Sequence, residues 1–264
     1  MTLPTLVAAF DTGTFWEALS PETAMGRALW ATVYISVSAQ VIGTIIGLFA
    51  ALGAMSRFVA LRALSGVYVW FFRGTPVIVQ VFFWYLGASI LFGFDLFPRE
   101  IDLGFMTMSG AALAGITALS INEGAYMSEI IRAGIMSVPP GQTEAALSVG
   151  MTRGTAMRRV VLPQAARIIV PGLGNEFNNM LKTSSLLTFI GVYELFQDAQ
   201  VRYSSNYQPV EVYFAVALWY LLLTTIWQLI QIQIERHLGR SDRAESESWA
   251  TRIFGVGGPR RSWA

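Results

Sequence analysis

Long apolar runs separated by short polar segments dominate the chain. Five of them exceed the length of about 20 residues that a helix needs to cross the hydrocarbon core of a membrane. These runs cover residues 28–56, 64–94, 106–131, 163–190 and 212–234. The pattern therefore predicts an all-α integral membrane protein with five transmembrane helices, contained in a membrane domain over residues 27–237.

The first two runs carry features that affect helix packing. The first contains Gly43-x-x-x-Gly47, a pattern that lets a neighbouring helix approach closely. The second is interrupted at residues 73–76, which read Arg-Gly-Thr-Pro, and proline removes a backbone donor and bends a helix. Arg73 lies close to apolar residues, so we expect it to reach water or a partner.

The distribution of arginine predicts the orientation of the helices, because cytoplasmic loops carry an excess of basic residues. With segment 1–26 outside the cytoplasm, five crossings leave three arginines outside, at positions 27, 99 and 202. Segment 1–26 has no basic n-region, so we expect a short external segment or interfacial helix rather than a cleavable signal peptide. The C-terminal tail, 238–264, is then cytoplasmic, lying on the bilayer surface or disordered. The twelve inner arginines are Arg57, Arg62, Arg132, Arg153, Arg158, Arg159, Arg236, Arg240, Arg243, Arg252, Arg260 and Arg261.

Composition agrees with a membrane location and argues against several chemistries. Hydrophobic residues make up 54% of the chain and charged residues 13%, whereas about 25% charged is usual in soluble domains. There is no cysteine and one histidine, His237, so thiolate and multi-histidine metal sites are not expected. The sole lysine, Lys182, lacks the preceding glycines of a phosphate-binding loop. We predict no catalytic residue, metal or cofactor in this chain; if ATP drives it, a partner chain binds ATP and Mg²⁺.

Polar residues inside the third run need partners. An unpaired carboxylate within a membrane span costs roughly 2.5 to 3.5 kcal/mol on insertion scales. Glu129 and Arg132 are three residues apart and can pair on one helix face. Glu123 has no such neighbour, so we expect it to face the protein interior or a water-filled cavity.

The fourth run carries a polar stripe. Asn175, Asn178, Asn179 and Lys182 follow the i, i+3, i+4, i+7 spacing of one helix face. Lipid does not solvate such a face, so we expect it to point into protein or into a polar path.

A short helix is predicted in the inner loop between the third and fourth runs. A Pro-Pro-Gly breaker precedes residues 142–149, most of which favour helix, and Gly150 stands where a helix would end. A helix this short is not stable alone and needs a surface to lie on. Ala145 and Ala146 would allow close approach to such a surface, and Gly150 would permit the turn that follows.

The loop over residues 139–163 resembles the cytoplasmic loop signature of ATP-binding-cassette (ABC) importer permeases. It reads Glu144-Ala-Ala, three residues, Gly150, nine residues, Val160 where the family usually has isoleucine, one residue, and Leu-Pro. In that family the loop holds a coupling helix, which docks in a cleft of the ATPase subunit. An ordinary surface helix with a glycine cap is the alternative. The resemblance implies that the ATPase-coupling residues are Gly141, Glu144, Ala145, Ala146, Gly150, Leu162 and Pro163.

Two more segments resemble the polar amino acid branch of that family, with His/Glu/Gln/Arg/opine-type substrates. They are residues 71–83, around Arg-Gly-Thr-Pro, and the Lys-Thr-Ser-Ser-Leu run that starts at Lys182. The resemblance identifies the chain as a permease (transmembrane) subunit of a type I ABC importer. It implies a bacterial inner membrane, contact with lipid, two ATPase copies, an identical or homologous second permease subunit and an extracytoplasmic solute-binding protein. No nucleic acid partner is expected. ATP-driven closure of the ATPase would draw the coupling helices together and switch the permease between inward-facing and outward-facing states.

The polar groups of the third and fourth runs are the candidates for the substrate path. Together they offer a cation, carboxylates and amide donors for the charged ends of an amino acid. Each could instead form an interhelical hydrogen bond or a dimer contact, because polar groups also hold membrane helices together. The candidates are Asn122, Glu123, Asn175, Glu176, Asn179, Lys182 and Ser184.

Two other functions remain open on the sequence. An ion-coupled secondary transporter needs no ATPase and commonly shows two related halves, but no half-chain repeat is visible and five spans do not divide into halves. A membrane scaffold or sensor would have no transport path of its own. Association with an ATPase subunit separates the importer from both.

Overall fold

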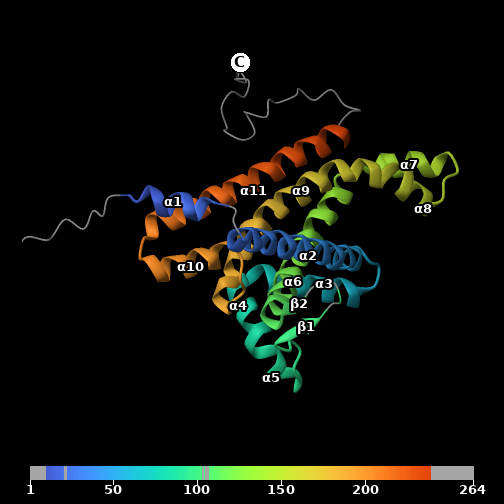
Figure 1. Cartoon of the computed structure of the whole chain (residues 1–264). Helices are drawn as coiled ribbons and strands as arrows, with labels where there is room; N and C mark the ends of the chain where they lie inside the picture. The colour runs from blue at the N-terminus through green and yellow to red at the C-terminus, as the bar shows by residue number, and fades with distance from the viewer. Residues whose placement is uncertain (1–9, 21–22, 103, 105–106, 239–264) are drawn as a thin grey trace, which may run out of the picture. The chain divides into compact units, whose positions relative to one another are not determined.

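The computed structural model describes residues 10–20, 23–102, 104 and 107–238 (Figure 1). Most of these residues are helical. The longer helices are α2 (Thr23–Ala54), α3 (Val59–Gly74), α6 (Gly110–Met136), α9 (Leu162–Thr183) and α11 (Pro209–Leu238). The shorter elements are α1 (Thr12–Leu19), α4 (Val77–Phe82), the π-helix η1 (Phe83–Gly87), α5 (Ala88–Phe92), α7 (Pro140–Ser148), α8 (Arg153–Ala156), the π-helix η2 (Met157–Val161), the 3₁₀-helix η3 (Ser184–Ile190) and α10 (Leu195–Asn206).

The chain forms two compact units. Unit 1 comprises Met1–Ser38, Ile78–Ala118 and Leu181–Leu223, and unit 2 comprises Ala39–Val77, Leu119–Met180 and Thr224–Ala264. The chain passes five times between them: inside α2, between α3 and α4, inside α6, near the end of α9 and inside α11.

Length and composition identify some of these helices as membrane spans. Within the described residues, Met25–Ala54 and Pro209–Leu238 are long and apolar enough to cross a membrane, and the broken pair Val59–Gly74 and Val77–Phe92 qualifies when taken together. Helices α6 and α9 are long enough, but the polar residues within them lower their hydropathy below that of an ordinary span. The predicted count of five spans therefore stays a prediction.

Unit 1 is built around the N-terminal part of α11. Its core contains Met25, Ala28, Leu195, Ala199, Val212 and Val216, which come from α2, α10 and α11. Helix α1 joins this group, because the backbone N–H of Asp11 donates to Glu211 (2.9 Å) and Phe15 stacks on Phe214. Figure 1 shows α1 and α10 beside the beginning of α11. The sequence pattern did not predict α10, since its residues read as a polar loop.

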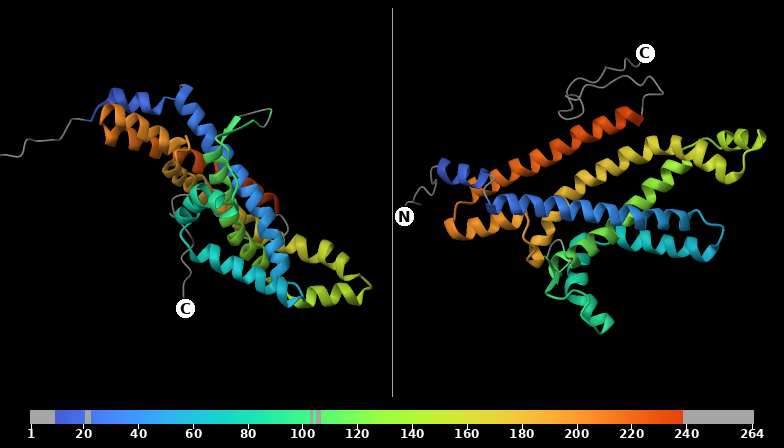
Figure 2. Two further views of the ribbon diagram at one scale, coloured as in Figure 1. Left: turned by 90° about the horizontal axis from the view of Figure 1, so that it is seen from below. Right: turned by 45° about the vertical axis from the view of Figure 1, so that its right-hand side comes forward.

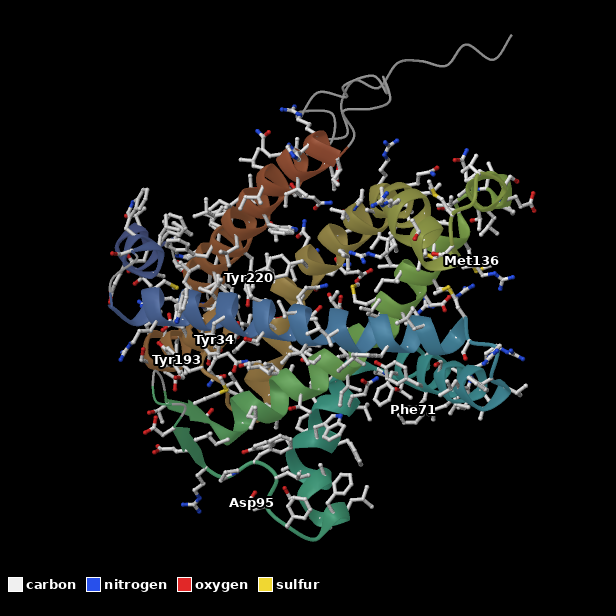
Figure 3. The ribbon with its side chains drawn as sticks, turned by 90° about the vertical axis from the view of Figure 1, so that its right-hand side faces the viewer. Tyr34, Phe71, Asp95, Met136, Tyr193 and Tyr220 are labelled. Carbon is white, nitrogen blue, oxygen red and sulfur yellow. The ribbon has the colours of Figure 1, made fainter. Side chains whose placement is uncertain are left out.

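A buried carboxylate organises the same unit. Glu194 is fully buried and caps α10 by accepting from the backbone N–H groups of Phe196 (2.9 Å) and Gln197 (3.0 Å). Its other oxygen accepts from the hydroxyls of Tyr220 (2.7 Å) and Thr32 (3.3 Å). Figure 3 labels Tyr193 and Tyr220, which come from the segments before α10 and within α11. This one side chain therefore links α2, α10 and α11.

A short hairpin also belongs to unit 1. Strands β1 (Glu100–Asp102) and β2 (Thr107–Ser109) pair antiparallel, with Ile101 opposite Met108. We expected the third span to start at residue 106, but α6 begins at Gly110 directly after β2. The apolar run is longer than the helix because Met108 is buried within the hairpin.

In unit 2 the two expected glycines bring α2 against α6. A Cβ on Gly43 would lie 2.7 Å from the Cβ of Glu123, and one on Gly47 would lie 2.4 Å from the Cβ of Met127. The backbones of α2 and α6 therefore approach so closely that only glycine fits at positions 43 and 47. The prediction of a close-packing glycine face is confirmed.

Two predicted contacts of charged residues in unit 2 are also present. Arg132 pairs with Glu129 at 2.8 Å, as the spacing predicts. The Arg73 guanidinium lies 5.1 Å from the centre of the Tyr126 ring, within the range of a cation–π contact. Arg73 thus has an aromatic partner, Tyr126, near the C-terminal end of α3.

Candidate functional site

The predicted short helix exists as α7. Pro140 occupies its first turn, where the missing N–H costs nothing, and the helix ends at Ser148. The backbone N–H groups of Gly150 and Met151 return to the carbonyls of Leu147 (3.0 Å) and Ala146 (3.1 Å). Gly150 has a φ of 84°, the left-handed region in which glycine is favoured, so the turn depends on it.

The two alanines of the loop have different surroundings. Ala146 is 5% exposed, and α7 packs against α8 and η2, so this methyl group faces the inside of the segment. Ala145 and Glu144 are exposed, together with the apolar side chains of Leu147 and Val149. The exposed face of α7 thus carries small and apolar side chains, which suits contact with another protein. Figure 2 shows α7 and α8 together at one end of α6 and α9.

Helix α7 is attached to the start of α9. Pro163 lacks an N–H, and the preceding turn widens into the π-helix η2. The Gln164 side-chain amide donates to the Val160 carbonyl (2.9 Å) and to the Gln142 side chain of α7 (3.4 Å). The segment that contains α7 therefore contacts the fourth predicted span through side chains as well as through the chain itself.

Asn122 lies on α6, and its side-chain amide donates to the Phe72 carbonyl at the end of α3 (2.9 Å). One turn before Phe72 in α3, the Tyr68 hydroxyl donates to the Ile121 carbonyl of α6 (2.6 Å). Asn122 was predicted as a residue of the substrate path, and the structure places it at the helix break.

Glu123 is 5% exposed and faces the protein interior, as expected. Its Oε1 accepts no hydrogen bond, and neither does the Oε1 of Gln40, a buried residue of α2 that interacts with the same carboxyl. Glu176 of α9 is near enough to repel the Glu123 carboxylate electrostatically. Two predicted path residues, Glu123 and Glu176, are therefore brought together in unit 2.

The polar stripe of α9 has mixed surroundings. Asn175 accepts from the Gln231 amide of α11 (3.3 Å), and the same amide donates to Glu235 (2.9 Å). Asn178 is half-buried, with an Oδ1 that accepts no hydrogen bond, whereas Asn179 is exposed. Part of the stripe is therefore hydrogen-bonded to α11 through Asn175.

Lys182 and Ser184 belong to unit 1, whereas the other candidates belong to unit 2. Ser184 is fully buried and donates to the Leu181 carbonyl (2.9 Å), a local helix contact. Lys182 is exposed.

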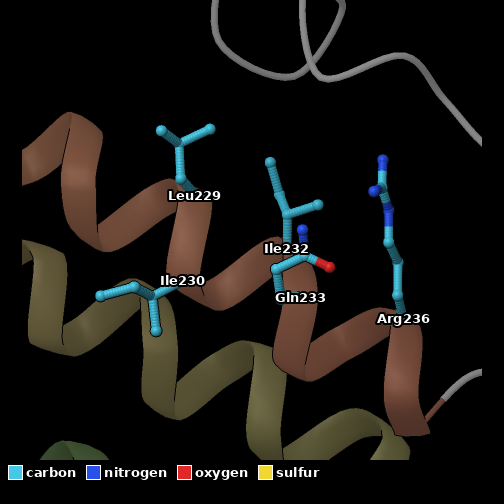
Figure 4. A pocket seen from close by; sticks show the side chains of 5 residues that line it. All are labelled: Leu229, Ile230, Ile232, Gln233 and Arg236. Atoms are coloured by element: carbon cyan, nitrogen blue, oxygen red, sulfur yellow. The ribbon is translucent and has the colours of Figure 1, made fainter.

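A hollow of about 410 Å³ lies on the C-terminal part of α11, lined by Leu229, Ile230, Ile232, Gln233 and Arg236 (Figure 4). Leu229, Ile232 and Arg236 point to the same side of the helix. The lining is mainly apolar and contains none of the predicted path residues, so it does not suit a ligand with two charged ends.

Residues that sequence reasoning missed are mostly glutamines and aromatic donors. Gln40 and Gln231 are single amides in apolar runs, and a search for uncharged polar residues would have found them. Tyr68 and Trp227 read as ordinary apolar residues, but Trp227 donates to the Gly174 carbonyl (2.7 Å). Only the fold reveals their partners.

Comparison with known proteins agrees with this geometry. Residues 43–240 match the family described as "Binding-protein-dependent transport system inner membrane component". The arginine transport system permease protein ArgU of Corynebacterium glutamicum is 38% identical over 217 residues, covering 82% of this chain and 68% of ArgU. The glutamine transport system permease protein GlnP of Escherichia coli K12 is 34% identical over 234 residues, covering 87% of this chain and 98% of GlnP.

Solved structures give the same result. A crystal structure of an amino acid ABC transporter with histidines contains a chain that is 37% identical, with a TM-score of 0.70, covering 90% of this chain and all of that one. The MetNI methionine ABC transporter in an inward-facing conformation is 18% identical with a TM-score of 0.66, and shows the fold alone. The chain belongs to the binding-protein-dependent transport system inner membrane component family, the permease subunits of ABC importers, whose ATPase is a separate subunit.

Proposed function

We propose that this chain carries polar amino acids across the bacterial inner membrane, receiving them from an extracytoplasmic binding protein and using ATP hydrolysed by a separate subunit. The relatives named for arginine and glutamine transport support the substrate class. The observation that carries the coupling is α7, a short exposed helix that follows α6 after three residues and is connected to α9 through α8 and η2. The comparisons do not favour a secondary transporter or a scaffold.

The proposed topology has five spans, an outer N-terminus and a cytoplasmic C-terminus. It is supported by the distribution of arginine, which is concentrated in the segments expected on the cytoplasmic side. Two ATPase copies and a second permease subunit complete the proposed assembly, with Glu144 and Gly150 at the ATPase contact.

The proposed substrate path includes Glu123, Glu176 and Asn179, with Asn175 at its edge. The buried Glu123 oxygen without a hydrogen-bond donor is suited to an ammonium group. Amino acids that stimulate ATP hydrolysis by the reconstituted complex identify the substrate; vanadate-insensitive uptake would contradict the importer.

The coupling proposal is tested with Gly150→Ala. We expect uptake per ATP hydrolysed to fall several-fold, because an L-residue in the left-handed region costs about 1–2 kcal/mol and the turn after α7 must shift. Gly154→Ala is the matched control, because Gly154 lies in the same exposed segment, has an ordinary φ and has no atom within 4 Å of an added Cβ. Equal losses of coupling in both variants, or none in Gly150→Ala, would contradict a role for this turn.

A separate prediction concerns α1 and lipid. Phe10, Trp16 and Phe214 are exposed and linked through Phe15 into one ring cluster, which continues the apolar surface of α11. Trp side chains favour the membrane interface. We therefore expect α1 to lie in the outer interfacial region of the bilayer.

The chain has no cysteine, so spin labels can be attached at single introduced sites. A label on Trp16→Cys should collide mainly with oxygen, which concentrates in lipid, and a label on the neighbouring Glu17→Cys mainly with a water-soluble nickel complex. Equal exposure of both labels to water would exclude the interfacial location. Protection of the Trp16→Cys label from both reagents would indicate a protein partner instead.

A further inference from the structure

A tyrosine forms the turn between α10 and α11. Tyr207 has φ 54° and ψ 30°, the left-handed conformation, and within the part of the chain that the structure describes it is the only residue other than glycine with a positive φ. Its backbone N–H closes the end of α10 by donating to the Tyr203 carbonyl (2.8 Å). Glycine or asparagine usually occupies such a position, because a bulky side chain crowds its own backbone there. The tyrosine is therefore held in a conformation that its side chain disfavours.

The elements on either side impose this conformation. Pro209 opens α11, and the residue before a proline disfavours the helical region, so Gln208 does not continue α10. The Gln208 side chain donates to the Asp11 carboxylate (3.4 Å), and its backbone N–H donates to the Asn206 side chain (3.0 Å). Contacts on both sides of Tyr207 thus fix the turn.

The Tyr207 ring gains little packing within the chain. The residue is 78% exposed, and its ring meets the Tyr203 ring edge-on, with the centroids 6.2 Å apart. Glycine would adopt the same φ without strain. Strained residues cluster at functional positions, where the surrounding structure holds them in place. An exposed tyrosine that strains its own backbone therefore indicates a contact outside the chain.

A small polar hollow lies next to this turn, between α1 and α10 of unit 1. Its volume is about 150 Å³. Figure 1 shows α1 beside the end of α10 and the start of α11. Polar walls suit water or the surface of a protein rather than lipid chains. The polar residues that line the hollow are Thr14, Glu17, Arg202, Ser205 and Asn206.

We propose that the turn at Tyr207 and the adjacent hollow form a contact surface for the extracytoplasmic binding protein, with the Tyr207 ring packed against that partner. The family description makes transport dependent on a binding protein. The proposed topology places α1, α10 and the start of α11 on the outer side of the membrane. Tyrosine supplies a large, rigid contact area at low entropic cost. This inference rests on the proposed function and adds the place at which the binding protein is held.

Tyr207→Gly tests the inference in the reconstituted complex of permease and ATPase. The concentration of substrate-loaded binding protein that gives half-maximal stimulation of ATP hydrolysis should rise about tenfold, as expected for a tyrosine lost from the centre of an interface. Tm should not fall, because relief of the left-handed strain offsets the flexibility that glycine adds to the unfolded chain.

Two variants serve as controls for Tyr207→Gly. Tyr207→Phe keeps the ring, so its half-maximal concentration should stay within about twofold of wild type. Phe94→Ala removes another exposed aromatic side chain of unit 1, at the outer end of the second predicted span, and should leave the half-maximal concentration unchanged.

A wild-type half-maximal concentration in Tyr207→Gly would overturn the inference. A rise accompanied by a lower Tm would also overturn it, because the ring would then support the fold. As a direct test, Tyr207→Cys labelled with a benzophenone should crosslink to the purified binding protein upon illumination. Crosslinks to phospholipid alone would identify an interfacial anchor and contradict the inference. If the binding protein does not stimulate the wild-type complex, the proposed function itself is contradicted.

Discussion

Replacing Gly47 with alanine is expected to destabilise the folded protein by about 3 kcal/mol. The added Cβ would lie 2.4 Å from the Met127 Cβ, 2.8 Å from the Gly124 carbonyl oxygen and 2.9 Å from the Ser128 nitrogen. Two of these atoms are backbone, so a rotamer change does not relieve the contact and α2 must move away from α6. The expected readouts are a lower Tm and a lower yield of membrane-inserted protein.

Gly66→Ala is the matched control for Gly47→Ala. Gly66 lies within α3, and no atom lies within 4 Å of an added Cβ. Alanine there should be neutral or stabilising by up to about 1 kcal/mol, since glycine weakens a helix interior. A wild-type Tm for Gly47→Ala would show that α2 and α6 do not touch at this point.

Glu194→Ala is the second substitution expected to have a large effect, a loss of about 3 kcal/mol or more in the free energy of unfolding. It would leave the backbone N–H groups of Phe196 and Gln197 and the Tyr220 hydroxyl without their acceptor. Helix α10 would also lose its N-terminal cap. Thermal unfolding of the purified complex measures the loss, and faster hydrogen exchange should be concentrated in α10. A change spread evenly over the chain would contradict the local cap.

Glu194→Gln gives a control with a defined pH dependence. Burial raises the pKa of the Glu194 carboxyl above its ordinary value, although the hydrogen bonds to it act in the opposite direction. The folded state then holds the proton more tightly than the unfolded state, so this stabilisation is complete below the ordinary pKa and declines as pH rises through the raised one. The Tm of wild type relative to Glu194→Gln should therefore fall with rising pH. A constant difference would exclude titration of this group.

The segment around α7 shows which parts of the structure local sequence predicts. The Pro-Pro-Gly start, the helical residues and the final glycine predict α7 because each acts within a few residues of itself. The Gly43 and Gly47 pattern likewise predicts a close contact, because small residues on one helix face let another helix approach closely. What these patterns do not contain is the identity of the contacting helix.

The polar residues show where sequence reasoning fails. Asn122 and Glu123 are adjacent in the chain, yet one bonds to the end of α3 and the other is buried between helices without a donor for its Oε1. Polarity within an apolar run predicts a partner but not which one, since the partner is supplied by residues about 50 positions away or more. The helices α1 and α10 were not predicted as firm elements because they are short and amphipathic, and their stability comes from packing on α11.

The sequence by itself determined the membrane class, the short helix of the inner loop, the glycine face of α2 and the likeness to importer permeases, because apolar run length, turn residues and motif spacing are local properties. Only the tertiary structure decided that Asn122 donates to the end of α3, that Glu194 links α10 to α2 and α11, and that Ser184 donates to the Leu181 carbonyl. Those choices depend on which helices meet, and hydrogen bonds between helices are set by three-dimensional packing rather than by spacing along the chain.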